Sequence, residues 1–165
     1  MKRFILLLSV IGMTIFFANA LYAGTQTASL NVSATAVAAC SVSVTDVNFG
    51  NYVGDYQYAS GNVEVTCSPG VTYYIALDAG QHSLGTDAGR QMSNGEVPPE
   101  FIGYELQSQP GIPWGDEGYG DTYLASPVQD LGNGAAQNHE VIATAYAAAV
   151  PAGSYSDVVQ VTVNY

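Results

Sequence analysis

The residues whose types could support a reaction lie together in the middle of the chain. His82 and Ser83 are adjacent, with Asp78 and Asp87 nearby, and these are the residue types of a hydrolytic triad. The surrounding letters GQHSLG do not match the G-x-S-x-G pattern that places a serine on a strand-to-helix turn. We therefore predict that the chain is not an enzyme.

A second group of candidate residues surrounds the single tryptophan. Trp114 is followed by Asp116, Glu117 and Asp121, so a sugar site or a calcium site is one hypothesis. Calcium, however, takes about six to eight oxygen ligands in one place, and the spacing here does not match an EF-hand loop. We predict a solvated acidic loop, with no metal and no cofactor.

Two further polar residues are assigned structural roles. Arg90 is the only Lys or Arg after residue 3. We expect it to pair with a carboxylate and to pin the loop that follows the third predicted strand. His139 begins a predicted strand and is expected to be a partly exposed structural residue.

The first 23 residues have the pattern of a secretory signal peptide. Lys2 and Arg3 precede an apolar run over residues 4–17, and small residues follow, so cleavage is expected after Ala20 or Ala23. The apolar run is shorter than the roughly 20 residues that span a bilayer. We predict an exported protein with no transmembrane segment in the mature chain.

Loss of the signal peptide leaves a strongly acidic chain. The remaining basic residue, Arg90, and the fourteen Asp and Glu residues together give a net charge of −13. Such a surface repels nucleic acid and anionic lipid, which are bound through Lys and Arg clusters. We interpret the charge as a means of staying soluble at high density, with docking to a basic partner as the alternative.

The chain contains two cysteines, Cys40 and Cys67. An even number of cysteines in an exported protein indicates a disulfide. A zinc site is disfavoured, because no further cysteine or histidine completes a ligand set.

The pattern of the mature chain is all-β. Val, Thr, Tyr and Ala dominate, and Gly, Pro, Asn and Asp interrupt the chain about every ten residues, which is typical of a sandwich or barrel. Two long polar stretches, 80–99 and 108–137, are long enough to be functional or to contain short structure of their own. Six strands are predicted, over residues 40–45, 62–67, 71–78, 100–107, 139–147 and 153–165.

The last predicted strand has one apolar face. Residues at every second position are apolar up to the end, namely Val159, Val161, Val163 and Tyr165. An apolar strand in this place needs a neighbour, because unpaired main-chain groups at a sheet edge recruit another strand.

A candidate neighbour lies at the other end of the mature chain. Residues 24–38 also alternate, and the apolar positions include Ala28, Leu30, Val32 and Ala34. We predict that this segment completes the fold of another copy. The alternative is an edge strand of its own domain.

Several segments, in order, resemble the spore coat protein U family, which includes the Csu-type pilins of the archaic chaperone–usher pathway. The residues that carry this resemblance are Cys40-Ser-Val-Ser-Val with Val47-Asn-Phe-Gly-Asn-Tyr52, Val63-Glu-Val-Thr-Cys67, Tyr73-Tyr-Ile-Ala-Leu-Asp-Ala-Gly80, Arg90-Gln-Met92, Trp114-Gly-Asp116, Val150 to Asp157, and the final V-x-V-x-V-x-Y. They extend from Cys40 to Tyr165.

The resemblance implies an incomplete immunoglobulin-like β-sandwich over residues 39–165, completed by a donor strand from another molecule. It implies a structural pilin that polymerises by donor-strand exchange in adhesion or biofilm formation. The partners would be a periplasmic chaperone, an outer-membrane usher and other pilin subunits. The subunit would cross the periplasm and end in an extracellular fibre.

In this interpretation, residues 24–38 are the donor and the apolar face of the last strand borders the vacant position. Two alternatives use the same fold: a spore or cyst coat component, and a secreted carbohydrate-binding adhesin.

The two cysteines generate a first prediction. Residues 40–67 enclose a loop of 28 residues. Closing such a loop stabilises a fold by roughly 3–4 kcal/mol in the chain-entropy treatment. We expect the Cys40→Ser/Cys67→Ser variant to lose about that free energy of unfolding in urea titrations. A midpoint unchanged from the wild type would contradict the disulfide.

Overall fold

The computed structural model describes residues 24–85 and 89–165, and these residues form nine strands and no helix. The chain divides after Thr35, and all nine strands belong to the second unit, Ala36–Tyr165. The predicted signal peptide, residues 1–23, lies outside the described residues. Within the described part, no segment forms a helix long and apolar enough to span a membrane.

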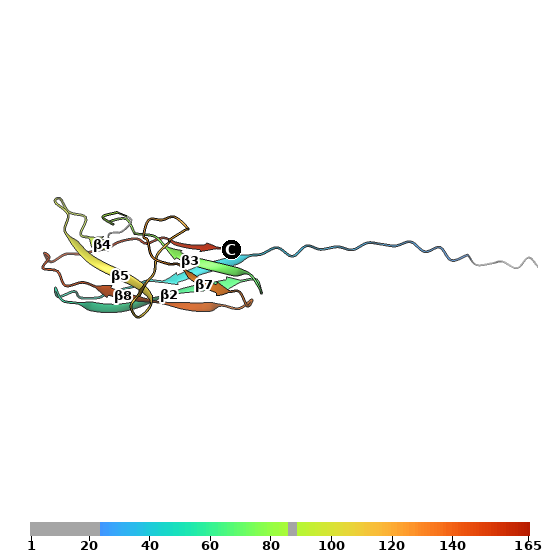
Figure 1. The fold of residues 1–165 in the computed structure, drawn as a ribbon, viewed down its shortest axis with the longest axis horizontal. Helices are drawn as coiled ribbons and strands as arrows, with labels where there is room; N and C mark the ends of the chain where they lie inside the picture. The colour runs from blue at the N-terminus through green and yellow to red at the C-terminus, as the bar shows by residue number, and fades with distance from the viewer. Residues whose placement is uncertain (1–23, 86–88) are drawn as a thin grey trace, which may run out of the picture. The chain divides into compact units, whose positions relative to one another are not determined.

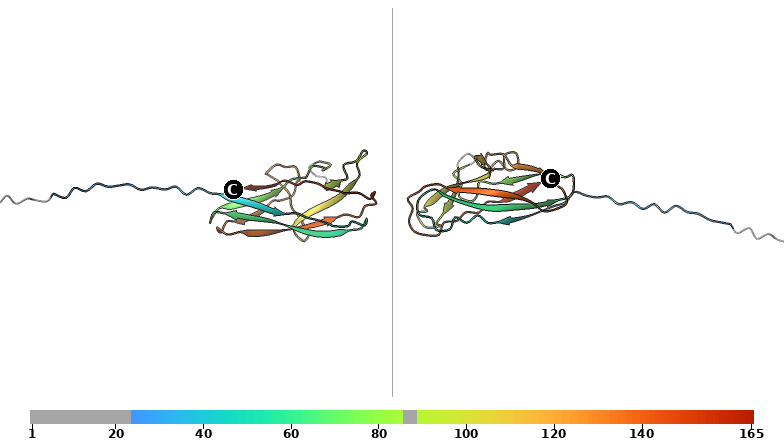
Figure 2. Two further views of the ribbon diagram at one scale, coloured as in Figure 1. Left: turned by 180° about the vertical axis from the view of Figure 1, so that it is seen from behind. Right: turned by 90° about the horizontal axis from the view of Figure 1, so that it is seen from below.

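The strands form two sheets, which lie as two layers in Figure 1 and in the views of Figure 2. The larger sheet has the order β1-β2-β8-β5-β4, with β6 paired to β5, and the smaller has the order β7-β3-β9. The pairings between these strands are all antiparallel. The strand bounds are β1 Cys40–Thr45, β2 Gln57–Cys67, β3 Thr72–Leu77, β4 Arg90–Ser93, β5 Phe101–Gln109, β6 Ile112–Pro113, β7 Val128–Leu131, β8 Gln137–Ala145 and β9 Val161–Asn164.

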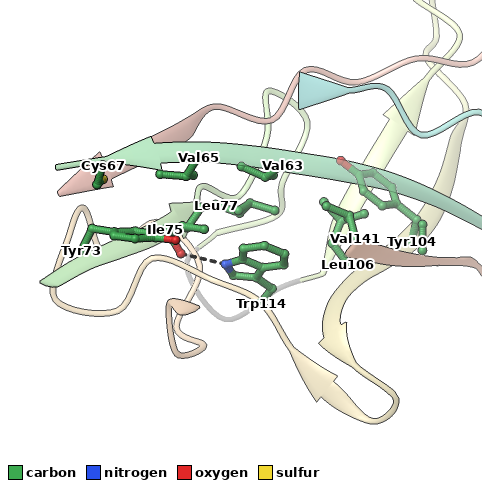
Figure 3. Close-up of a cluster of buried hydrophobic side chains, with 11 residues drawn as sticks. Val63, Val65, Cys67, Tyr73, Ile75, Leu77, Tyr104, Leu106, Trp114 and Val141 are labelled. Atoms are coloured by element: carbon green, nitrogen blue, oxygen red, sulfur yellow. Dashed lines mark hydrogen bonds between the residues drawn. The ribbon is translucent and has the colours of Figure 1, made fainter. Parts of the chain in front are cut away.

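The core lies between the two sheets and is built from residues at every second position. Figure 3 shows one row of β2 side chains facing a row from β3, with β5 and β8 closing the side. This alternation buries one face of each strand and leaves the other toward water. The rows that meet are Val63, Val65 and Cys67 from β2, Tyr73, Ile75 and Leu77 from β3, Tyr104 and Leu106 from β5, and Val141 and Ala143 from β8.

Cys40 and Cys67 form a disulfide, as predicted. The two residues are direct partners at the end of the β1–β2 ladder, with a Cα–Cα distance of 4.1 Å. The bond thus fastens β1, an edge strand, to the second strand of the sheet.

The all-β sandwich predicted from the sequence is confirmed, but the chain has more strands than the six expected. The polar stretch 80–99 contains β4, and the stretch 108–137 contains β6 and β7. These strands have two to four residues each. Segments this short cannot show a full apolar–polar alternation. They are recognised as strands by their pairing with neighbouring strands rather than by their own sequence.

Trp114 follows β6 and occupies the centre of the core. Its side chain is fully buried, and its Nε1–H donates to the Ile75 carbonyl at 2.8 Å (Figure 3). Its main-chain N–H also bonds to Leu106 of β5. The indole therefore joins β3 to the chain that leaves β5.

We expect Trp114→Phe to lower the free energy of unfolding by about 1–3 kcal/mol, because it leaves the Ile75 carbonyl without its donor and opens a small cavity. Urea titration measures this. Tyr58→Phe is the control, since Tyr58 is 74% exposed and its change should stay within about 0.5 kcal/mol. Equal effects in the two variants would contradict the role of the indole.

Candidate docking groove beside the terminal strand

The terminal strand β9 is bonded along one edge only in the described structure. It is the last strand of the three-stranded sheet, and its neighbour there is β3. The register pairs Leu77 with Val161 and Tyr74 with Asn164. The other edge of β9 faces no strand of this sheet.

The hydrogen bonds show which residues of the terminal strand point toward the vacant side. The Asp78 N–H donates to the Gln160 carbonyl at 3.2 Å, whereas the Leu77 N–H points away from β9 and donates to Gly115 at 3.1 Å. Successive residues of a strand direct their main-chain groups to opposite edges. Gln160, Thr162 and Asn164 thus face β3. The remaining residues form what we call the open edge: the N–H and C=O groups of Val159, Val161, Val163 and Tyr165.

The side chains of the open edge follow the predicted alternation. Val159, Val161 and Val163 are partly buried and pack against the core. Gln160 and Thr162 between them are exposed. Tyr165 continues the periodicity, but 62% of its surface is exposed. The residues that point apolar side chains inward are therefore the same ones that present unpaired main-chain groups outward.

A groove of about 1240 Å³ borders the beginning of this strand, where Val159 and Val161 line it. One wall is residues 44–54, and the other is residues 148–159 with Val161. The Tyr52 hydroxyl joins the walls at one end, where it accepts from the Ala148 N–H at 2.7 Å and donates to the Tyr146 carbonyl at 2.6 Å. The floor is made by core side chains, namely Val63, Leu77, Met92, Ile102, Tyr104, Leu106 and Val141.

The first strand shows that the sandwich is uncovered here. Val42 and Val44 of β1 lie directly opposite Val65 and Val63 of β2, so all four side chains share the inner face. The β2 residues are 0% and 1% exposed, but Val42 and Val44 are 45% and 55% exposed. The inner face of β1 thus lacks the covering layer that buries its neighbour.

The described part of the N-terminal unit is exposed, unlike the core of the second unit. Residues 24–35 contain no strand and are exposed, with Leu30 at 88% and Val32 at 86%. Residues 24–39 carry no charged side chain. This segment offers alternating apolar side chains without an electrostatic penalty for burial.

The family model that matches the sequence is the Spore Coat Protein U domain, over residues 26–162. The chain belongs to the Spore Coat Protein U domain family. The family resemblance noted in the sequence is thereby confirmed.

A solved structure shares the fold of this Spore Coat Protein U domain. It is the CsuC–CsuE chaperone–tip adhesion subunit pre-assembly complex from archaic chaperone–usher Csu pili of Acinetobacter baumannii. The match has a TM-score of 0.53 and 23% sequence identity, and it covers 79% of this chain and 40% of that chain. No curated protein matches the sequence.

The described members of the candidate triad, His82 and Ser83, have the following partners in this Spore Coat Protein U domain. His82 Nδ1 contacts Asp157 Oδ1 at 3.1 Å rather than Asp78, and the Ser83 hydroxyl donates to the Gly85 carbonyl at 2.8 Å. Asp87 lies outside the described residues.

The prediction of a solvated acidic loop is wrong for Asp116. Asp116 is 3% exposed, and its carboxylate accepts from the Thr122 and Tyr123 N–H groups at 3.1 and 2.7 Å. Trp114 is buried and cannot stack on a sugar. Within the described residues, no group of three or more His, Cys, Asp or Glu is placed to hold a metal ion.

The expectation that Arg90 pairs with a carboxylate is also wrong. It is fully buried, and it bonds to main-chain carbonyls instead of a carboxylate, those of Leu77, Asp78 and Trp114 at 2.8–2.9 Å. Its guanidinium carbon lies 4.2 Å from the centre of the Tyr123 ring. Burial lowers the pKa of Arg90. It does pin the end of β3, as predicted, but carbonyl oxygens supply the partners.

His139 is structural, as expected. Its Nε2 lies 3.0 Å from the Tyr73 hydroxyl and 3.6 Å from the Asp130 carboxylate. Burial, followed by the charge of Asp130, raises the pKa of Tyr73 to about 12, and burial lowers the pKa of His139.

Asp157 has a structural role that was not predicted from the sequence. Its side chain is 2% exposed and lies on the wall of the groove, where it binds Gln81, His82 and Tyr104. An acidic residue within the apolar segment predicted as the last strand was the available signal, but its partners are about 50–75 residues distant in the chain.

The inward side chains of β9 yield a prediction. Val161→Asn places an amide against the core and should lower the free energy of unfolding by about 1–3 kcal/mol. Thr162→Asn, one position along on the exposed face, should stay within about 0.5 kcal/mol. Thermal or urea unfolding of the two variants tests the orientation, and the reverse order of effects would contradict it.

Proposed function

We propose that the chain is a structural pilin subunit of a chaperone–usher fibre that polymerises by donor-strand exchange. The observation that carries the proposal is the open edge of the last strand, which borders a groove over an incompletely covered core. A strand inserted there would bond to the open edge and cover Val42 and Val44. This is the strand-addition mode of recognition.

The proposed donor is the segment 24–38 of a neighbouring subunit. Ala28, Leu30, Val32 and Ala34 would enter the groove, while the polar residues between them face water. Burying Leu30 and Val32 contributes about 1.5–3 kcal/mol each, and the alanines contribute less. Main-chain hydrogen bonds along the open edge, at about 0.5–1.5 kcal/mol each, would supply much of the remainder.

Each part of the chain would then have its own role. Residues 1–23 would direct export, 24–38 would be the donor extension, and 39–165 would be the domain that receives a strand. A periplasmic chaperone would occupy the groove before the outer-membrane usher joins the subunits. The structural match supports this order, because it is a chaperone–subunit pre-assembly complex.

The description of the matching family favours a second candidate, a spore or cyst coat component. Such a component would use the same open edge and the same donor. The two candidates differ in location: a pilin is released by shearing intact cells, whereas a coat protein remains in the coat extract. Immunoblots of the two fractions separate them.

The donor assignment is tested with mature chain carrying Leu30→Asn and Val32→Asn. We expect this variant to remain monomeric under conditions where the wild type forms fibres, because the amides lose the apolar burial. Size-exclusion chromatography and electron microscopy are the measurements. The matched control is Ser29→Asn with Ser33→Asn, on the polar face, which should still assemble.

A truncated chain lacking residues 24–38 tests the receiving half. It can accept a donor but gives none, so we expect it to stop fibre growth when added to assembling wild-type chain. Normal assembly of the truncated chain alone, or of the Leu30→Asn/Val32→Asn variant, would overturn the proposed function.

A further inference from the structure

The segment just before β9 is tied to the β3–β4 connection by two carboxylates. Asp78 follows β3 and reaches the terminal segment, and Asp157 lies in the terminal segment and reaches back. Each carboxylate accepts a hydrogen bond from one main-chain N–H of the other segment. We call this reciprocal pair of contacts the carboxylate clamp.

Asp78 forms the first half of the clamp. Its Oδ1 accepts from the Gln160 N–H and from the Gly80 N–H, both at 2.9 Å, while its own N–H donates to the Gln160 carbonyl at 3.2 Å. The side chain thereby extends the β3–β9 ladder past the last residue of β3 and the first residue of β9. Arg90 holds the Asp78 carbonyl at 2.8 Å, so the residue is fastened on the core side as well.

Asp157 forms the second half and is almost completely buried. Its Oδ1 accepts from the Gln81 N–H at 2.9 Å and lies 3.1 Å from His82 Nδ1. Gly80 passes so close that a Cβ there would collide with the carboxylate, and its φ of +78° also suits glycine. The turn at residues 80–82 is thus shaped around this side chain.

The clamp is anchored in the larger sheet. The Tyr104 hydroxyl of β5 donates to Asp157 Oδ2 at 2.6 Å. Burial and this bond raise the pKa of Tyr104, so the phenol remains a donor at physiological pH. Ser156 adds two main-chain bonds with Ser93 of β4, at 2.9 and 3.0 Å.

These contacts hold the side of the segment that faces β3 and β4. Gln160 makes the bonds to Asp78, whereas Val159 and Val161 next to it belong to the open edge. The clamp therefore orders the strand without using the main-chain groups that a donor would need. A short strand bonded on one side only would otherwise open locally, because few contacts hold it.

We propose that Asp78 and Asp157 are positioning residues that keep the open edge in strand geometry while the groove is vacant, so that an incoming donor meets a pre-formed partner. This inference rests on the proposed function. Once a donor is bound, its own hydrogen bonds hold the edge. Loss of the clamp should then affect the vacant state more than the filled one. A purely structural role would weaken both states alike.

The test uses the full mature chain with Leu30→Asn and Val32→Asn, which supplies a receiving domain without a competing donor. A fluorescent peptide with the wild-type sequence of residues 24–39 is the probe, and stopped-flow anisotropy measures its association and dissociation rates. Asp157→Ala and Asp78→Ala are introduced separately. Glu117→Ala is the matched control, since Glu117 is an exposed acidic residue that does not line the groove.

We expect Asp157→Ala to slow association about tenfold, the result of reducing the receptive fraction to about one tenth, with dissociation unchanged within about twofold. Asp78→Ala should act in the same direction, and Glu117→Ala should change neither rate. Tyr104→Phe removes one hydrogen bond of the clamp with little change of shape. Tyr104→Phe should slow association less than Asp157→Ala does. If Asp157→Ala does not fold, Tyr104→Phe is used for the test in its place.

Three results would overturn the inference. One is unchanged association in the clamp variants, and another is faster dissociation that accounts for the whole loss of affinity. In both cases the proposed function stands, because the unmodified receiving domain still takes up the peptide. The third is failure of that domain to bind the peptide, which removes the proposed function and the inference together.

Discussion

The structure depends on a terminal strand whose main chain is bonded along one edge only. In β9 and the residues just before it, the side chains that point inward, Val159, Val161 and Val163, belong to the residues whose N–H and C=O groups face the vacant side. Buried main-chain groups need partners, and apolar side chains need a complete covering layer. On the edge of β9 that faces β3 both requirements are met, and on the opposite edge neither is met. A single inserted strand would satisfy both at once, which is why an open edge and an uncovered core occur together.

The bonded side of β9 is fastened by several contacts in succession. Trp114 binds the Ile75 carbonyl, Arg90 binds the carbonyls of Leu77 and Asp78, and Asp78 binds Gln160. These contacts form a continuous path from the core to the terminal segment. Arg90 is the one Lys or Arg among the described residues and is buried, so the exposed charges of fixed sign there are all negative. The uncharged segment 24–39 is a part of the chain that can approach such a surface without repulsion.

Much of the fold could be predicted, because the alternation of apolar and polar residues with period two is visible in the amino-acid sequence. The predicted strands 62–67, 71–78 and 100–107 each bury residues at every second position, namely Val63 and Val65, Tyr73, Ile75 and Leu77, and Ile102, Tyr104 and Leu106. The disulfide followed from two cysteines in an exported chain. The strands that escaped prediction, β4, β6 and β7, are too short for a periodic pattern. The roles of Arg90 and Asp116 were misjudged because charged residues are usually exposed, and only main-chain partners brought together by folding make their burial favourable.

The sequence by itself determined that the chain is all-β and that apolar alternation recurs at both ends, since those properties depend on neighbours within a few residues. It also determined the absence of charge from residues 24–39. Only the tertiary structure decided that the inner face of β1 is uncovered, that the Tyr52 hydroxyl bonds to Ala148 on the other wall of the groove, and that Asp157 meets Gln81, His82 and Tyr104. Those facts join residues about 50–100 positions apart. No local sequence pattern predicts such long-range contacts, because they depend on how the two sheets pack and on which part of the core this packing leaves uncovered.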